Sequence, residues 1–162
     1  NIPVRIARFH NIYGPKGTFK GGREKAPAAI CRKVIETPHD GDIEIWGDGS
    51  QTRSFLYIDE CIEGVRRLME SDWSGPVNIG SDEMVTINQL VDTAETFTKK
   101  KLNRVYKLDA PTGVRGRNSD NKLIQEKLGW SPNYPLAAGI ARTYDWIWDQ
   151  INQESLVDHS SI

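Results

Sequence analysis

Hydrophobic and polar positions follow two different periods along the chain, which indicates a protein built from both strands and helices. Short runs rich in β-branched and aromatic residues predict strands at residues 4–9, 43–46, 52–58, 77–79 and 104–108. Apolar residues return at helical spacing in the segments 27–36, 59–69, 87–97, 120–129 and 136–151, which predicts a helix in each. Because strands and helices alternate, the predicted fold class is α/β.

Capping residues mark the ends of several predicted helices. Thr86 and Gln89 have the spacing of a capping box, in which each side chain bonds the backbone N–H of the other residue. Asp59 is expected to cap the N-terminus of the second helix, and Gly129 is expected to end the fourth. The helix boundaries therefore rest on local chemistry as well as on periodicity.

Composition places the chain among ordinary globular proteins. It has 162 residues, of which 38% are hydrophobic and 27% charged, enough for one domain with a hydrophobic core. We expect a single α/β domain over residues 1–153 and a polar tail over residues 154–162. No apolar run approaches the roughly 20 residues of a membrane span, and no secretion signal opens the sequence.

Charge and cysteine usage exclude several function classes. The formal net charge is -1, and the scattered basic residues are offset by acidic ones, so neither nucleic acid nor a membrane is an expected partner. The two cysteines, Cys31 and Cys61, form no CxxC motif, and the three histidines do not cluster. We therefore expect no metal site, reduced thiols and a cytoplasmic location.

Three loops carry residues that could bind a ligand. Residues 11–26 follow a strand and precede a helix, and they supply glycine N–H groups, an asparagine amide and several cations, a set that suits phosphate. Gln51 and Arg53 flank a Gly-Asp-Gly turn, and Arg115 and Arg117 lie in a glycine-flanked loop before a helix. Taken alone, each loop also fits a plain surface turn with solvated charges.

Taken in order, four segments resemble the extended short-chain dehydrogenase/reductase family of nucleotide-sugar enzymes. They are R-x-x-N-x-YGP at residues 8–15, WGDG-x-QTRSF-x-x-ID at 46–59, VNIGS at 77–81, and R-x-x-D followed by LGW-x-P at 117–132. Each is weak alone, but their order and spacing cover nearly the whole chain. The resemblance implies the C-terminal, substrate-binding portion of a Rossmann-like nucleotide-sugar epimerase.

The sequence also departs from that family. The family's cofactor half carries a GxxGxxG turn and a Tyr-x-x-x-Lys pair, and neither occurs here. The resemblance therefore implies that the N-terminal NAD-binding half is absent. NAD would be the cofactor of the full-length family, whereas this chain alone is expected to bind no cofactor and to be inactive.

Within the family, the segments FHNIYGP, GGREKAPAA and GVRGRNSDN are most similar to an epimerase that acts on a GDP-sugar. In that enzyme NAD oxidises the hydroxyl at carbon four of the hexose, and the ketone acidifies the C–H bonds at carbons three and five. The match places Lys25 in the acid/base pair that moves those protons, and Arg117 at the diphosphate. It assigns further substrate contacts to Asn11, Glu24, Ala26, Lys33, Gln51, Thr52 and Arg53.

Two other interpretations stay open. The chain could derive from another nucleotide-sugar 4-epimerase or a dehydratase, although a 4-epimerase needs no acid/base pair at carbons three and five and hence no counterpart of Lys25. It could also be a non-catalytic, self-associating module. Expected partners are a GDP-sugar and either a second copy of the chain or the missing N-terminal half, met along the strand edge at Val4 and Ile6.

Overall fold

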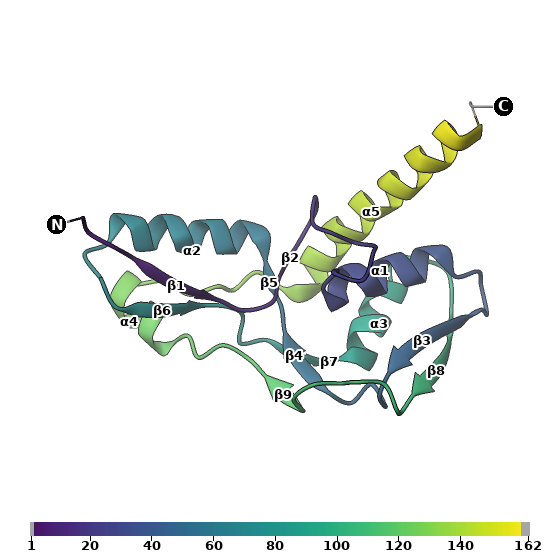
Figure 1. Ribbon diagram of the computed structural model, residues 1–162, viewed down its shortest axis with the longest axis horizontal. Coiled ribbons are helices and arrows are strands. Elements are labelled where there is room, and N and C mark those ends of the chain that lie inside the picture. Colours follow the sequence, from purple (N-terminus) through teal and green to yellow (C-terminus); the bar gives the residue numbers. More distant parts are fainter. Residues whose placement is uncertain (1, 160–162) are drawn as a thin grey trace.

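Strands and helices alternate through the molecule, so the predicted α/β class is confirmed (Figure 1). The computed structural model describes the backbone of residues 2–159 and the side chains of residues 2–154. The elements are β1 (Ile6–Phe9), β2 (Ile12–Tyr13), α1 (Ala26–Glu36), β3 (Asp42–Trp46), β4 (Thr52–Ser54), β5 (Leu56–Tyr57), α2 (Ile58–Glu70), β6 (Pro76–Ile79), β7 (Met84–Thr86), α3 (Ile87–Glu95), β8 (Asn103–Lys107), β9 (Gly116–Arg117), α4 (Lys122–Leu128) and α5 (Leu136–His159).

The strands form small, separate sheets rather than one continuous sheet. β1 pairs with β6, β2 with β5 and β3 with β8, and all three pairs are parallel. β4 lies between β7, to which it runs antiparallel, and β9, to which it runs parallel. The short pairs in the middle of the molecule bring loops from distant parts of the sequence to one place.

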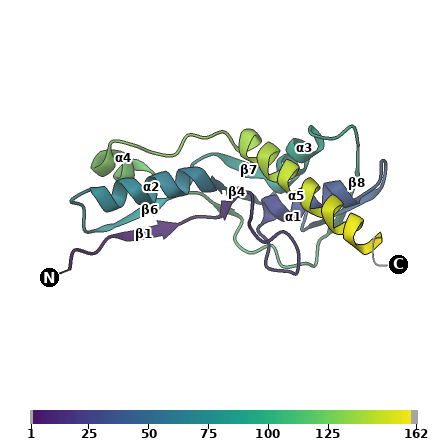
Figure 2. The same ribbon diagram turned by 90° about the horizontal axis from the view of Figure 1, so that it is seen from above.

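The molecule is elongated, with two lobes joined by the short central strands (Figures 1 and 2). One lobe, here the β1 lobe, consists of β1, β6, α2 and α4. The other, the α1 lobe, consists of α1, α3, α5, β3 and β8. The C-terminal part of α5 projects from the α1 lobe, at the end of the molecule opposite β1.

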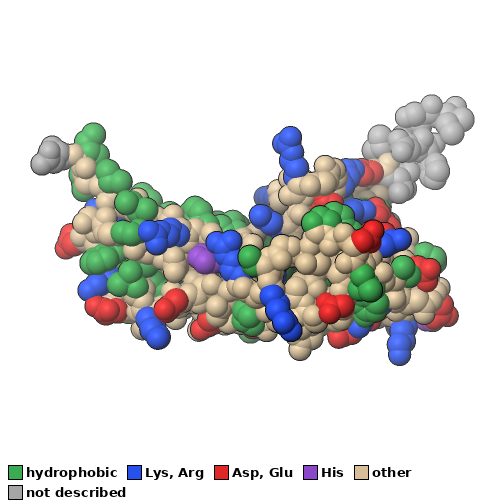
Figure 3. Space-filling model, turned by 60° about the horizontal axis from the view of Figure 1, so that its bottom comes forward, with side chains coloured by type: hydrophobic (Ala, Val, Ile, Leu, Met, Phe, Trp, Pro, Cys, Tyr) green, Lys and Arg blue, Asp and Glu red, His purple; other side chains and the backbone are tan. Residues whose placement is uncertain are grey.

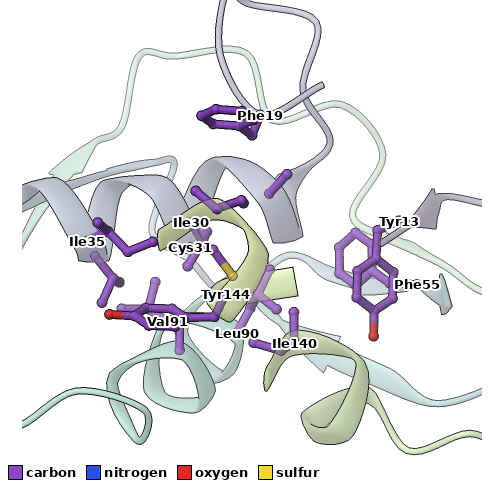
Figure 4. Packing of buried hydrophobic residues seen from close by; sticks show 14 of the residues in the cluster. Tyr13, Phe19, Ile30, Cys31, Ile35, Phe55, Leu90, Val91, Ile140 and Tyr144 are labelled. Atoms are coloured by element: carbon purple, nitrogen blue, oxygen red, sulfur yellow. The ribbon is translucent and has the colours of Figure 1, made fainter. Parts of the chain in front are cut away.

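Each lobe has its own hydrophobic core. In the α1 lobe, Cys31 of α1, Leu90 of α3 and Ile140 of α5 are fully buried against one another's elements (Figure 4). In the β1 lobe, Ile79 of β6 and Ile124 of α4 are fully buried in one cluster with Leu68 of α2. Burial of this kind stabilises by about 25 cal/mol per Å² of apolar surface, so the α1 lobe holds its helices rigidly beside the central strands.

The structure agrees with some capping predictions and corrects one. Thr86 is the N-cap of α3 and forms the reciprocal capping box with Gln89. Gly129 ends α4 in the left-handed conformation, with φ 60°. Asp59 does not cap α2, whose N-cap is Tyr57; Asp59 instead lies in the first turn, where the helix dipole favours an acidic residue.

The prediction of one strand over residues 52–58 was wrong. The segment divides into β4 and β5, which pair with different strands, and its last residue, Ile58, already belongs to α2. Phe55 and Leu56 are both buried, so the apolar run in the sequence is continuous. The chain nevertheless leaves one sheet after β4 and enters another at β5. At the C-terminus, α5 continues through residues 154–159 of the expected polar tail, and residues 160–162 lie outside the described residues.

Candidate functional site

A cleft of about 610 Å³ lies beside the N-terminus of α1, between that helix and β3 and β4. Lys and Arg side chains gather over the middle of the face shown in Figure 3. The cleft brings together residues from four segments that are far apart in the sequence. Of the residues selected from the sequence, those that line it are Asn11, Glu24, Lys25, Ala26, Lys33, Gln51 and Arg53.

Lys25 lies where the glycine-containing loop enters α1. It is the N-cap residue of the helix in extended conformation, and its carbonyl accepts a hydrogen bond from the Ala29 N–H at 3.0 Å. Pro27 occupies the first turn, as its fixed φ and missing N–H allow. The carbonyl of Lys25 is therefore anchored on the helix, its N-terminal side continues into the loop, and its exposed side chain lines the cleft.

Asn11 reaches the cleft from the turn that joins β1 to β2. Its φ is 40°, a left-handed conformation that asparagine tolerates better than most residues. Its Nδ2 donates to the Ser54 carbonyl at 3.0 Å, and its own carbonyl accepts from the Leu56 N–H at 3.1 Å. These bonds attach the turn to the segment between β4 and β5.

Gln51 and Arg53 enter the cleft from the start of β4. Gln51 Nε2 donates to the Trp46 carbonyl at 2.7 Å, which closes the Gly-Asp-Gly turn, while its buried Oε1 has no hydrogen-bond partner among the described residues. The Arg53 guanidinium donates to the carbonyls of Thr52 at 2.7 Å and Thr112 at 2.9 Å. The carbonyls orient this guanidinium without neutralising its charge.

Thr52 and Arg117 do not line the cleft, but both belong to the strand pair at its edge. The register of the β4–β9 pair places Thr52 opposite Gly116 and Arg53 opposite Arg117. Side chains of register partners on neighbouring strands project to the same face of a sheet. Arg117, which is exposed, therefore extends the positive charge of Arg53 along the sheet face.

The cleft carries more positive charge than its carboxylates neutralise. Among the described residues, the Lys33 ammonium donates only to the Glu44 backbone carbonyl, at 2.9 Å. Within the part of the chain that the structure describes, Lys25, Lys33, Arg53 and Arg117 form no ion pair with a carboxylate. Cations gathered without counter-charges favour the binding of an anionic group.

Glu24 is the acidic group beside Lys25, and it is already partnered. Backbone N–H groups of Glu24 itself and of Gly22 hold the pKa of its carboxyl below the usual value, with Arg32 adding to the effect and burial opposing it. The Arg32 guanidinium lies 3.4 Å from Glu24 Oε1, and the Glu24 side chain is only 10% exposed. Glu24 is therefore ionised at neutral pH.

The structure adds lining residues that the sequence reasoning missed. Trp46, Phe55 and Thr112 line the cleft, and so does Arg32 from the second turn of α1. Helical spacing could have indicated Arg32. It lies three residues after Ala29, which also lines the cleft, and residues three apart share one face of a helix. Thr112 gave no such signal, because its place at the cleft depends on the path of the loop between β8 and β9.

The connection from β1 to α1 differs from the strand-to-helix turn of a dinucleotide site. Such a site needs a tight glycine turn that leads from a strand directly into a helix, whose free N–H groups meet the pyrophosphate. Here residues 10–25, which include β2, separate β1 from α1. Pro27 also removes one N–H from the first turn of that helix. NAD therefore does not fit the strand-to-helix connection that this chain offers.

Metal ligands, membrane-spanning helices and reactive thiols are not offered by the described residues. Among the side chains of residues 2–154, no group of three or more histidines, cysteines, aspartates or glutamates is placed to hold a metal ion. None of the helices within residues 2–159 is long and apolar enough to cross a membrane. Burial raises the pKa of the Cys31 thiol to about 12 and also raises that of Cys61, so neither is a ready nucleophile at neutral pH.

The sequence is similar to that of nucleotide-sugar enzymes. Residues 1–80 match the model of the NAD dependent epimerase/dehydratase family. The chain is 60% identical to GDP-mannose 3,5-epimerase of Arabidopsis thaliana over 153 residues, which is 94% of this chain and 40% of that protein. It is 32% identical to UDP-glucuronic acid decarboxylase 6 of the same plant over 139 residues, 86% of this chain and 39% of that protein.

Solved structures agree with these similarities. UDP-glucose 4-epimerase of Thermotoga maritima, solved with UDP-glucose, superposes with a TM-score of 0.80 at 27% identity, over 90% of this chain and 46% of that one. UDP-glucuronic acid 4-epimerase of Bacillus cereus, solved with UDP-glucuronic acid and NAD, gives a TM-score of 0.79 at 28% identity, over 92% and 46%. The resemblance to nucleotide-sugar epimerases and the Rossmann-like epimerase fold are confirmed, and the chain spans less than half of these relatives.

Proposed function

We propose that this chain, a relative of the NAD-dependent nucleotide-sugar epimerases, forms the part of a GDP-sugar epimerase that binds the sugar nucleotide. The observation that carries the proposal is the group of cations without carboxylate partners at the cleft, namely Lys25, Lys33, Arg53 and Arg117. A diphosphate supplies the missing negative charge, and arginine binds phosphate oxygens through paired N–H groups.

Each part of the substrate has a proposed place. Arg53 and Arg117 hold the diphosphate, because the guanidinium of Arg53 is already oriented by two carbonyls and Arg117 lies beside it in register. The hexose then extends towards the N-terminus of α1. There Lys25 moves a proton to or from a carbon of the sugar ring, and Asn11 and Glu24 contact the hexose.

The proposed site on this chain does not include the NAD cofactor. NAD, in the family, supplies the reversible oxidation of a hydroxyl on the sugar. Because the connection between β1 and α1 offers no dinucleotide site, we expect no saturable binding of NAD to this chain alone. The chain alone is accordingly proposed to bind the sugar nucleotide without turning it over.

A UDP-sugar is the alternative substrate class, because the solved 4-epimerases that superpose on this chain bind UDP-sugars. The sequence favours the GDP-sugar, since identity is 60% to the Arabidopsis GDP-mannose 3,5-epimerase and 32% to the UDP-glucuronic acid decarboxylase. Titration of the chain with GDP-mannose and with UDP-glucose under the same conditions separates the two.

Arg117→Ala tests the proposed diphosphate site by calorimetry with GDP-mannose. Loss of a charge-assisted bond to phosphate is expected to weaken binding by about 1.5–3 kcal/mol. Arg66→Ala is the control, because Arg66 is an exposed arginine on α2 that pairs with Glu63 and Glu70, remote from the cleft residues. Equal affinities of the unaltered chain and the Arg117 variant would remove Arg117 from the diphosphate site.

A further inference from the structure

The loop that carries Lys25 has little conformational preference of its own. It consists of residues 14–25, between β2 and α1, and no strand or helix forms within it. Gly21 and Gly22 have φ values of 90° and 83°, which only glycine adopts without strain. A loop of this composition needs contacts from outside to keep one shape.

Helix α5 supplies two of those contacts. The ring of Phe19, which is buried, meets the ring of Trp146 edge-to-face with their centroids 5.4 Å apart. Lys20 Nζ lies 2.7 Å from Glu154 Oε1, but both side chains are 56% exposed, so this pair is weak. The α5 contacts therefore hold the middle of the loop and leave its end, at Glu24 and Lys25, without a restraint from that helix.

Arg32 of α1 connects the middle of the loop to its end. Its Nε donates to the Phe19 carbonyl at 2.9 Å, and its Nη2 lies 3.4 Å from Glu24 Oε1. Its Nη1 donates to Glu36 Oε2 at 2.7 Å, one turn further along the same helix. The planar guanidinium thus contacts three groups at once, and two of them belong to the loop.

Lys25 itself has no comparable restraint. Among the described residues, its ammonium takes part in no hydrogen bond or ion pair, although its side chain lines the cleft. The position of its backbone depends on α1 on one side and on Glu24 on the other. A shift of Glu24 would therefore move both of the groups assigned to the hexose.

We propose that Arg32 is a positioning residue that holds Glu24 and Lys25 against the hexose of the bound sugar nucleotide. This inference rests on the proposed function. Because its guanidinium is occupied by its three contacts, Arg32 acts through the loop, whereas Arg53 and Arg117 bind the diphosphate from the β4–β9 strand pair. The difference between the chain's affinities for GDP-mannose and for GDP should then depend on Arg32. The affinity for GDP alone should not depend on it.

Arg32→Lys tests this by titrating the full chain with GDP and with GDP-mannose. A lysine keeps the charge but cannot contact Phe19, Glu24 and Glu36 together. We expect the affinity for GDP-mannose to fall about fivefold to tenfold, towards that for GDP, while the affinity for GDP changes less than about twofold. Hydrogen exchange over residues 14–25 should accelerate in the same variant.

Two further variants separate positioning from general stability. Glu24→Gln weakens the same bridge and should accelerate hydrogen exchange over residues 14–25 as Arg32→Lys does. Its effect on affinity does not isolate positioning, because Glu24 is itself a proposed contact of the hexose. Glu36→Gln removes the third, exposed contact of Arg32 and should leave both affinities unchanged. An equal loss of both affinities in Arg32→Lys, or a loss of neither, overturns the positioning role alone. If the unaltered chain binds neither ligand, the proposed function fails, and the positioning role with it.

Discussion

At the residue scale, the site depends on how each charge is partnered. Glu24 is held ionised by backbone N–H groups and Arg32, whereas Lys25 is exposed and forms no ion pair with any described residue. Because the folded pKa of the Glu24 carboxyl lies below its usual value in an unfolded chain, its contribution to stability is fully present above that usual value. The contribution is lost as the pH falls through the folded pKa, so the loop before α1 should loosen only in acid.

Lys25→Ala separates proton transfer from binding. The variant is made in this chain fused to the remaining part of the Arabidopsis relative, so that the oxidation step is available. We expect GDP-mannose binding to change little and deuterium incorporation at carbons three and five to slow by roughly a hundredfold or more. Lys99→Ala, which changes an exposed lysine after α3, is the control. Unchanged incorporation in the Lys25 variant would exclude Lys25 from the acid/base role.

At the scale of elements, local signals identified most helices but not the sheet pairing. Thr86 and Gln89 indicated the start of α3 because a capping box involves only residues three positions apart. The split of residues 52–58 into two strands could not be read locally, because it depends on distant partners such as β2 and β9. For the same reason the sequence indicated Arg53 and Arg117 separately, and only the β4–β9 register brings them side by side.

Thr86→Ala tests the contribution of the capping box to α3. The side chain of Thr86 accepts from the Gln89 N–H at 3.0 Å, and its loss leaves that N–H without a protein partner. We expect the free energy of unfolding to fall by about 1 kcal/mol in urea denaturation. Thr96→Ala, at the other end of the same helix, should cost less, since Thr96 only donates back to the Thr93 carbonyl. A Thr86 variant as stable as the unaltered chain would contradict this account of the helix start.

At the scale of the whole molecule, the two lobes differ in how completely their surfaces are covered. In the described residues β1 pairs only with β6, and Val4 and Ile6 are 62% and 46% exposed. An unpaired edge with exposed apolar side chains favours pairing with a further strand. A second copy of the chain, or a cofactor-binding half like that of the longer relatives, stays the predicted partner of this edge. The cleft lies against the other lobe, so its residues are ordered by α1, α3 and α5.

The central claim is that this cleft binds the diphosphate of a sugar nucleotide, and a nuclear magnetic resonance titration tests it most directly. Amide shifts of the isotopically labelled chain are followed as GDP-mannose is added. We predict saturable shifts confined to the cleft segments, namely residues 11–33, 46–55 and 112–117, with β1 and β6 unaffected. An absence of shifts, or shifts centred on the β1 lobe, would contradict it.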